Sequence, residues 1–301
     1  MKSIQLDTHG QPMNHAFNYS RNKAKFAYTL RGILQGVTAD KKLNEAELVF
    51  LDMWLQSSNA EKTGDTVDLL DLIADAIEDE IISDEELQEI HELINDIIEY
   101  GTESSLEIEN TINELIGILR GITADEKITE EEFHHLDNWI NENEHISDEW
   151  IVSQIIDKIK EIKDDGVVTK EELDNLLPII KSLVGQSFAE TGLADGGVSE
   201  VFSSDIECFS HDGKTICFTG AFVNGKRASI ENVAKELGAT TVGNVTKKVD
   251  ALVIGTFSSQ DWRFSSYGRK IEKALKQQSK GHNIIILSER QWIKLMKSDC
   301  K

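Results

Sequence analysis

The chain has 301 residues, of which 40% are hydrophobic and 28% charged, and a formal net charge of −23 at pH 7. This length allows two or three domains with separate cores, and the composition is that of an ordinary globular protein. No run of about 18 apolar residues occurs, so we expect no membrane span, and the first residues lack the apolar core of a signal peptide, so we expect a cytoplasmic protein. Cys208, Cys217 and Cys300 lack C-x-x-C spacing, which argues against a disulfide framework and against a zinc site.

The charge is distributed unevenly along the chain. Residues 1–187 carry 41 acidic and 15 basic side chains, whereas residues 214–298 carry 6 acidic and 15 basic ones. The acidic part would be repelled by nucleic acid, while the basic part is suited to a polyanion. The acidic part either docks a basic protein partner or presents a solvated surface without a partner, and charge alone leaves both open.

A duplicated helical region fills the first part of the chain. Residues 1–20 show no periodicity and are expected to form a flexible tail, whereas from Arg21 onward apolar side chains recur at helical spacing. Residues 36–55 and 121–140 share glycine, threonine, alanine, aspartate and tryptophan at matching positions, 85 residues apart. The sequence therefore predicts an all-α duplicated bundle, with helical repeat 1 at 21–105 and helical repeat 2 at 106–188, in which Trp54 and Trp139 fill equivalent core positions.

A shorter motif, Asp-x-x-apolar-[Ser/Thr/Asn]-x-x-Glu-[Leu/Phe], occurs four times in this region. A Ser, Thr or Asn followed three residues later by Glu is typical of a capping box, in which each side chain accepts a hydrogen bond from the backbone of the other residue at a helix start. The predicted pairs are Asn44 with Glu47, Ser83 with Glu86, Thr129 with Glu132 and Thr169 with Glu172.

The same loops resemble the second half of an EF-hand calcium loop, most closely at Asp165-Gly166. An EF-hand needs oxygen ligands at its first and third positions, where these loops have residues such as Lys163, Ile77 and Gly36. Capping explains every recurring residue without a metal, so we expect no metal site. The alternative, a metal-responsive stress protein, predicts calcium-dependent thermal stabilisation.

Two further resemblances bear on the helical region. The stretches that contain Ala39-Asp40 and Ala124-Asp125 are similar to the TerB-like helical domains of bacterial tellurite-resistance proteins. This resemblance covers residues 21–187 and implies an interaction or sensing domain, not an enzyme.

Residues 163–166 spell Lys-x-Asp-Gly, the nucleotide-attachment motif of DNA ligases. That chemistry needs a β-rich domain, whereas this lysine lies between two predicted helices, so we do not expect a ligase site.

The chain changes character after residue 188. Residues 189–213 are rich in Gly, Ser and Asp and are expected to form a linker with one docked stretch. Beyond it, short apolar runs at 215–218, 240–242, 251–254 and 283–287 alternate with helical patterns at about 229–237, 268–278 and 289–297. This order predicts a small parallel sheet flanked by helices, an α/β domain at 214–298.

The landmarks of this domain follow one another in a recognisable order. They are the strand end Phe218-Thr219-Gly220, then Arg227, the turn Gly238-Ala239, the strand 251–254, Gly268-Arg269-Lys270, and Trp292 in the last helix. Over about 85 residues they resemble a BRCT domain of the kind found in bacterial NAD-dependent DNA ligases and in clamp-loader large subunits. The resemblance implies a non-catalytic module that binds a phosphate group or a partner protein.

The resemblance also implies a phosphate pocket. In phosphate-binding BRCT domains a hydroxyl and the next glycine amide, at the end of the first strand, and a lysine near the start of the second helix contact the phosphate; here these are Thr219, Gly220 and Lys270. A hydroxyl, an unhindered amide and an ammonium near a helix N-terminus suit an anion. The alternative is that Thr219-Gly220 only makes the turn after the strand. Neighbouring phosphates would extend the contacts to Arg227, Lys247, Lys248 and Arg269.

These patterns favour a binding protein over an enzyme. No catalytic triad, Gly-rich phosphate loop or cofactor motif occurs, so we expect neither catalysis nor a cofactor. The leading hypothesis is an adaptor in DNA repair, replication or defence against foreign DNA that binds DNA, at a 5′-phosphate end, through the BRCT domain. The second hypothesis is a protein-interaction scaffold whose BRCT domain binds a phosphopeptide or a partner subunit. Salt-sensitive DNA binding that depends on the 5′-phosphate separates the two.

Overall fold

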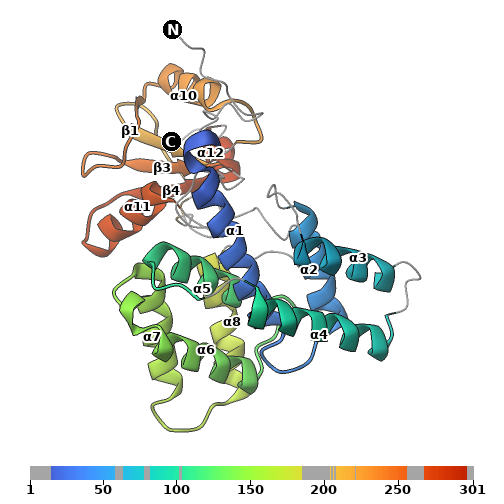
Figure 1. The fold of residues 1–301 in the computed structure, drawn as a ribbon. Coiled ribbons are helices and arrows are strands. Elements are labelled where there is room, and N and C mark those ends of the chain that lie inside the picture. Colours follow the sequence, from blue (N-terminus) through green and yellow to red (C-terminus); the bar gives the residue numbers. More distant parts are fainter. Residues whose placement is uncertain are drawn as a thin grey trace. The chain divides into compact units, whose positions relative to one another are not determined.

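The computed structural model describes residues 15–57, 64–77, 82–101, 104–184, 204, 206, 208–220, 222–255 and 268–296. The chain divides into two compact units (Figure 1), a helical unit of residues 20–195 and a C-terminal unit that contains residues 196–301. Within the described ranges, no helix combines the length and the apolar character needed to cross a membrane. The predicted fold class, an all-α part followed by an α/β part with a small parallel sheet, is confirmed.

The helical unit contains two similar sets of helices, one from each predicted repeat. Helix α1 begins at His15, inside the segment 1–20 that the sequence predicts to be a tail. Pro12 is the last helix breaker before it, so a helix can start soon afterwards; residues 1–14 lie outside the described residues. The helices are α1 (His15–Val37), α2 (Glu45–Ser57), α3 (Asp65–Ile77), α4 (Asp84–Tyr100), α5 (Ile108–Ile122), α6 (Glu130–Glu142), α7 (Trp150–Ile162) and α8 (Lys170–Val184), with a 3-10 turn η1 (Glu144–Ile146).

The four predicted capping boxes are confirmed. At the start of α4, the Ser83 hydroxyl accepts a hydrogen bond from Glu86 N at 3.2 Å, and the Glu86 carboxylate accepts one from Ser83 N at 2.8 Å. These bonds satisfy backbone donors that a helix start would otherwise leave unpaired. The same reciprocal bonds join Asn44 to Glu47 before α2, Thr129 to Glu132 before α6, and Thr169 to Glu172 before α8.

Helices α1 and α5 cross at glycines that occupy the same places in the two repeats. A Cβ atom on Gly121 would lie 2.6 Å from Ile33 O, and one on Gly36 would lie 2.5 Å from Ile118 O. The two backbones are therefore in direct contact, which side chains at these positions would prevent. The crossing joins the two repeats, and it involves Gly32 and Gly36 in α1 and Gly117 and Gly121 in α5.

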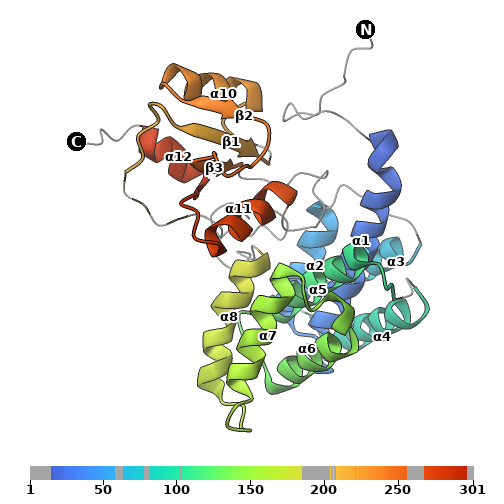
Figure 2. The ribbon, with the colours of Figure 1, turned by 90° about the vertical axis from the view of Figure 1, so that its left-hand side faces the viewer.

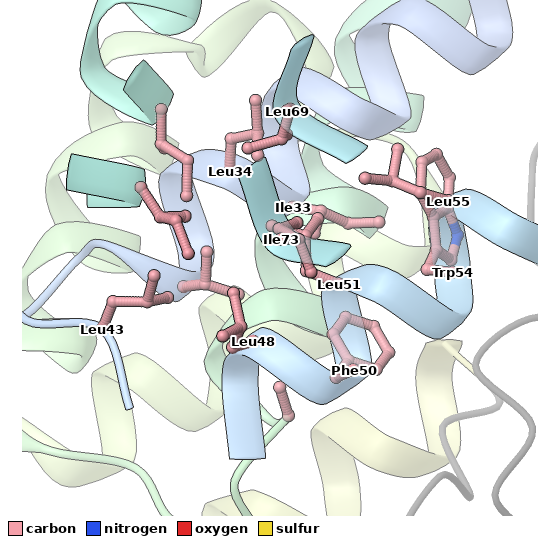
Figure 3. Close-up of a cluster of buried hydrophobic side chains, with 14 of the residues drawn as sticks. Ile33, Leu34, Leu43, Leu48, Phe50, Leu51, Trp54, Leu55, Leu69 and Ile73 are labelled. Carbon is pink, nitrogen blue, oxygen red and sulfur yellow. The ribbon is translucent and has the colours of Figure 1, made fainter. Parts of the chain in front are cut away.

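Each repeat places its tryptophan in a buried position, as predicted. Trp54 stacks on Phe26 with ring centroids 5.3 Å apart, and both Trp54 and Trp139 are buried. Figure 3 shows how apolar side chains from α1, α2 and α3 point toward one another in the first repeat. The buried set includes Ile33, Leu34, Leu43, Leu48, Phe50, Leu51, Trp54, Leu55, Leu69 and Ile73.

The C-terminal unit is a four-stranded parallel sheet with strand order β2-β1-β3-β4. Apolar side chains of β1 and β3 pack with α10 and α12 on one face, while Figure 2 shows α10 and α11 on opposite sides of the sheet. All predicted strands and helices are present, with bounds shifted by a few residues. They are β1 (Thr215–Thr219), α10 (Arg227–Glu236), β2 (Thr240–Val242), β3 (Ala251–Ile254), α11 (Arg269–Ser279), β4 (Ile285–Ser288) and α12 (Glu289–Met296).

The packed part of this unit begins before residue 214, where the sequence places the end of the linker. Phe209 and Ile206 pack in the core of the sheet. Ser204 N donates to Ile286 O at 2.6 Å, so this segment pairs with the edge of β4. The cysteine spacing argued against a disulfide framework, but Cys208 is disulfide-bonded. Cys217 is a buried free thiol.

Candidate functional site

The topology of the sheet changes direction between the neighbouring strands β1 and β3, because the connections that follow them lead to opposite edges of the sheet. Strand β1 leads through α10 to β2 on one side, and β3 leads through α11 to β4 on the other. Because such crossovers are right-handed, α10 and α11 lie on opposite faces, and both helices begin near the carboxyl ends of β1 and β3. Parallel sheets bind ligands at such a switch point. The predicted pocket residues belong to the segments that meet there.

Thr219 and Gly220 form the end of β1. Thr219 is 4% exposed, and its carbonyl oxygen accepts a hydrogen bond from Gly255 N at 2.8 Å, which holds the end of β1 against β3. Among the described residues, the Thr219 hydroxyl has no hydrogen-bond partner. Gly220 has a φ of +83°, a conformation that favours glycine and that lets the chain turn directly after the strand.

Two cations reach the same strand end from the two helices. Lys270, in the first turn of α11, donates from Nζ to Phe218 O at 3.0 Å. Arg227, the first residue of α10, donates from Nη2 to Gly220 O at 3.0 Å. The carbonyl groups that they contact lie on either side of Thr219. The structure therefore brings together Thr219, Gly220, Arg227 and Lys270, four of the predicted site residues.

The electrostatics of this cluster reflect its burial. Burial lowers the pKa of the Lys270 ammonium, and the nearby Arg227 charge lowers it further, whereas Cys217 and Glu231 act in the opposite direction. Burial also raises the pKa of the Cys217 thiol, which keeps its proton more firmly. Within the described part of the chain, the cluster thus holds two cations beside one acidic neighbour, Glu231, and it favours an anion with several oxygen acceptors.

The starts of α10 and α11 add to this preference. Neither N-cap residue, Lys226 before α10 nor Gly268 before α11, makes a side-chain capping bond. In the helical unit, by contrast, capping boxes satisfy the corresponding donors at the starts of α2, α4, α6 and α8. The helix dipoles place partial positive charge at these two helix starts of the C-terminal unit, which favours an anion.

The other predicted basic residues do not join this cluster. Lys247 and Lys248 are exposed and lie three and two residues before Asp250, whose backbone amide donates to Thr215 O at the opposite end of β1. The five residues of β1 separate the two ends by about 13 Å. Arg269 is the first residue of α11, but its side chain lies outside the described residues, as does the polar insertion 256–267.

Two of the landmark residues, Trp292 and Gly238, have structural roles in the C-terminal unit. Trp292 is 1% exposed, and its ring meets the Phe218 ring edge-on at 5.5 Å. Gly238 ends α10 with a φ of +88°, and a Cβ atom there would lie 2.5 Å from Asp212 Oδ1. Both residues therefore support the fold beneath the site.

Sequence reasoning missed two acidic residues near the site. Glu231 lies four residues after Arg227, the spacing at which helical side chains interact, and that spacing was an available signal. Glu289 follows β4 and is buried, and its carboxylate binds the loop between β1 and α10. Nothing in the local sequence points to that loop, because 65 residues separate the partners.

The ligase-like motif lies in a different environment from that of a nucleotidyltransferase. Lys163 caps the C-terminus of α7, and its Nζ donates to Asp137 Oδ2 at 2.6 Å. Asp165 accepts a hydrogen bond from Val167 N at 2.9 Å and shapes the turn before α8. These groups hold a helix–loop–helix junction together.

Comparisons with known proteins agree with the α/β fold of the C-terminal unit. The model of the BRCA1 C Terminus (BRCT) domain matches residues 211–296. DNA ligases are among the curated relatives: that of Beijerinckia indica is 29% identical over 143 residues, which are 44% of this chain and 18% of the ligase. Those of Bartonella quintana and Fervidobacterium nodosum are 34% identical over 84 residues and 32% identical over 85, in each case 28% of this chain and 10% of the ligase.

These matches limit what can be carried over. The chain spans less than a fifth of the length of these ligases. No solved structure matches the chain significantly. The match begins at residue 211, where His211 is already buried against Phe209 and Trp292 in the core of the unit. Residues 211–296 are therefore a BRCT domain, related to those of bacterial DNA ligases.

Proposed function

We propose that this protein is a non-enzymatic adaptor in DNA repair, replication or defence against foreign DNA, and that its BRCT domain binds DNA at a 5′-phosphate end. The DNA ligase relatives support a role in DNA metabolism. The acidic helical unit, with 41 acidic and 15 basic side chains in residues 1–187, is unsuited to DNA, so the basic BRCT domain carries the contact.

One observation carries the proposal. Lys270 and Arg227 converge from two helices on the end of β1, beside the Thr219 hydroxyl that has no partner among the described residues. A terminal phosphate offers more oxygens and more charge than an internal one, so it can accept from the hydroxyl and both cations at once. An internal phosphate diester would leave part of this donor set unused.

The test compares duplex DNA with a 5′-phosphate and with a 5′-hydroxyl. The wild-type chain is expected to bind the phosphorylated end at least about tenfold more tightly, the value of one good charge-assisted hydrogen bond. Affinity should also fall with salt, by about 0.9 logarithmic units per tenfold change for each phosphate neutralised. The double variant Thr219→Ala, Lys270→Glu should lose the preference for the phosphate.

A matched control places the same chemical changes at the other end of the sheet. Thr240 begins β2 and Lys280 follows α11, and both are exposed. The variant Thr240→Ala, Lys280→Glu should keep the preference for the phosphorylated end. Equal binding of both ends by the wild-type chain would sink the DNA-end proposal. Phosphate-dependent binding of a phosphopeptide without any DNA binding would instead support a protein-interaction scaffold.

Glu231 is expected to weaken phosphate binding. Its carboxylate favours the charged form of Lys270 and would repel an incoming phosphate. The variant Glu231→Gln should therefore bind the phosphorylated end about two- to fivefold more tightly, the size of a partly exposed charge interaction. Glu236→Gln, at the far end of α10, changes the net charge equally. The same gain in both variants would show that only net charge matters.

A further inference from the structure

A buried carboxylate holds the loop that forms one wall of the proposed phosphate pocket. Glu289 is the first residue of α12, directly after β4, and is 0% exposed. A carboxylate removed from water is stable only when donors surround it. Its partners therefore show what the structure gains from placing an acid at this position.

Three donors to Glu289 come from two neighbouring residues of the β1–α10 loop. Val223 N donates to Oε2 at 3.0 Å, and Asn224 N donates to Oε1 at 2.8 Å. The Asn224 side chain adds a bond from Nδ2 to Oε1, also at 2.8 Å. Hydrogen bonds to a charged acceptor are roughly twice as strong as neutral ones, so this clamp defines the loop conformation firmly.

The position of Glu289, directly after β4, shows that it does more than stabilise the start of its own helix. An acid in the first turn of a helix ordinarily stabilises its own helix through the dipole. Strand β4, which Glu289 follows, is separated from β1 by β3, so the carboxylate reaches a loop that belongs to a strand two places away. Among the described residues, Val223 N and Asn224 N have no other acceptor.

The clamped loop connects the two parts of the pocket. It begins at Gly220, whose carbonyl oxygen receives the bond from Arg227, and it ends where α10 begins. Phe222 packs against Phe218 with ring centroids 6.0 Å apart, which fixes the start of the loop. Gly225, just before the start of α10, has a φ of +139°, a conformation that favours glycine. The bonds to Glu289 thus hold the middle of the loop, between Phe222 and the start of α10.

We propose that Glu289 is a positioning residue of the phosphate site, which holds the β1–α10 loop so that Gly220 and Arg227 face the ligand. This inference rests on the proposed function. Glu289 contacts no ligand itself, and it acts through the conformation of the loop.

The experiment measures the two steps separately in the full-length chain. Hydrogen exchange at the amides of Val223 and Asn224 reports loop order without any ligand. The affinity ratio for duplexes with a 5′-phosphate and a 5′-hydroxyl reports the pocket, and a uniform loss of folded protein would leave this ratio unchanged. The variants are Glu289→Ala, the isosteric Glu289→Gln, and Asn224→Ala, which removes one of the three bonds.

Glu289→Ala is expected to speed exchange at both loop amides and to lower the affinity ratio about tenfold, the equivalent of one lost charge-assisted hydrogen bond. Glu289→Gln and Asn224→Ala should give intermediate ratios, and they keep the test valid should the alanine variant fail to fold. Asp250→Ala is the matched control, because Asp250 clamps the opposite end of β1 by accepting from Thr215 N at 2.8 Å. It should leave the ratio unchanged.

Each contrary result has a distinct meaning. Unchanged exchange at Val223 and Asn224 in Glu289→Ala would overturn the clamp. Faster exchange with an unchanged affinity ratio would overturn its role in positioning. A wild-type chain that binds both duplex ends equally would overturn the proposed function itself, whatever the variants show, and the positioning role would fall with it.

Discussion

Replacing Gly117 with alanine should destabilise the helical unit by about 3 kcal/mol, because the new methyl group would meet the backbone of α1. Its Cβ would lie 2.8 Å from Ile33 N and closer still to Thr29 O. Neither atom is the end of a flexible side chain, so the helices must move apart, and overpacking of this kind costs typically 1–3 kcal/mol. Separating α1 from α5 also opens the surrounding core, which adds to that cost.

The sign of this effect is what makes the prediction informative. In an exposed helix, alanine is more favourable than glycine by about 1 kcal/mol, so helix propensity alone predicts a gain in stability. Denaturant unfolding followed by far-ultraviolet circular dichroism measures the difference. Gly243→Ala, in the C-terminal unit, is the control for the substitution itself and should leave the unfolding of the helical unit unchanged, since nothing lies within 4 Å of a Cβ there. A Gly117→Ala variant as stable as wild type would contradict the close crossing of α1 and α5.

The helix starts were predictable from sequence, whereas this crossing was not predicted. A capping box is a local device, since its two side chains bond within three residues, and so Ser83 and Glu86 reveal it directly. The crossing depends on which helices meet, which sequence does not state. A signal was nevertheless present, because glycines spaced by four residues recur in both repeats, at Gly32 and Gly36 and again at Gly117 and Gly121.

The site shows the same division between local and distant information. Thr219 and Lys270 were predicted from a family resemblance, and the contact of Lys270 with Phe218 O places them together. Lys247 and Lys248 were grouped with them only because they are basic. Asp250, two residues later, bonds to the first residue of β1, so this pair lies at the wrong end of the sheet. Charge identifies a candidate, but register along a strand decides whether it reaches the site.

The junction of the two repeats gathers acidic groups whose protonation bears on stability. Asn44 Nδ2 donates to Asp125 Oδ2 at 3.1 Å, so the capping loop of one repeat contacts the equivalent loop of the other. Burial raises the pKa of Glu47 from 4.5 to about 9, opposed by the Asn44 amide and increased by the charges of Asp125, Glu132 and Asp40. Burial likewise raises the pKa of Glu132 to about 7.

The helical unit is therefore expected to lose stability as the pH rises. A carboxyl group that is protonated in the folded chain and ionised in the unfolded chain makes folding take up a proton, which costs about 1.4 kcal/mol per pH unit for each group. Each group contributes its full stabilisation below pH 4.5. The contribution of Glu132 is lost as the pH rises from 4.5 to about 7, and that of Glu47 as the pH rises from 4.5 to about 9. The contribution of Glu86 to stability changes with pH in the opposite direction, because the hydrogen bonds from Ser83 lower the pKa of its carboxyl group.

Variants separate this contribution from all other titrations of an acidic chain. Glu47→Gln keeps an oxygen that can accept from Asn44 N but carries no charge. It should match wild type near pH 4 and exceed it by about 2 kcal/mol or more near pH 9, measured by denaturant unfolding at each pH. Glu86→Gln, in the capping box of α4, should instead be less stable than wild type at neutral pH and match it only in acid. If the stability of the Glu47→Gln variant ran parallel to that of wild type at every pH, the pKa of Glu47 would be ordinary in the folded chain. Burial at the junction of the repeats would then not keep this carboxyl group protonated.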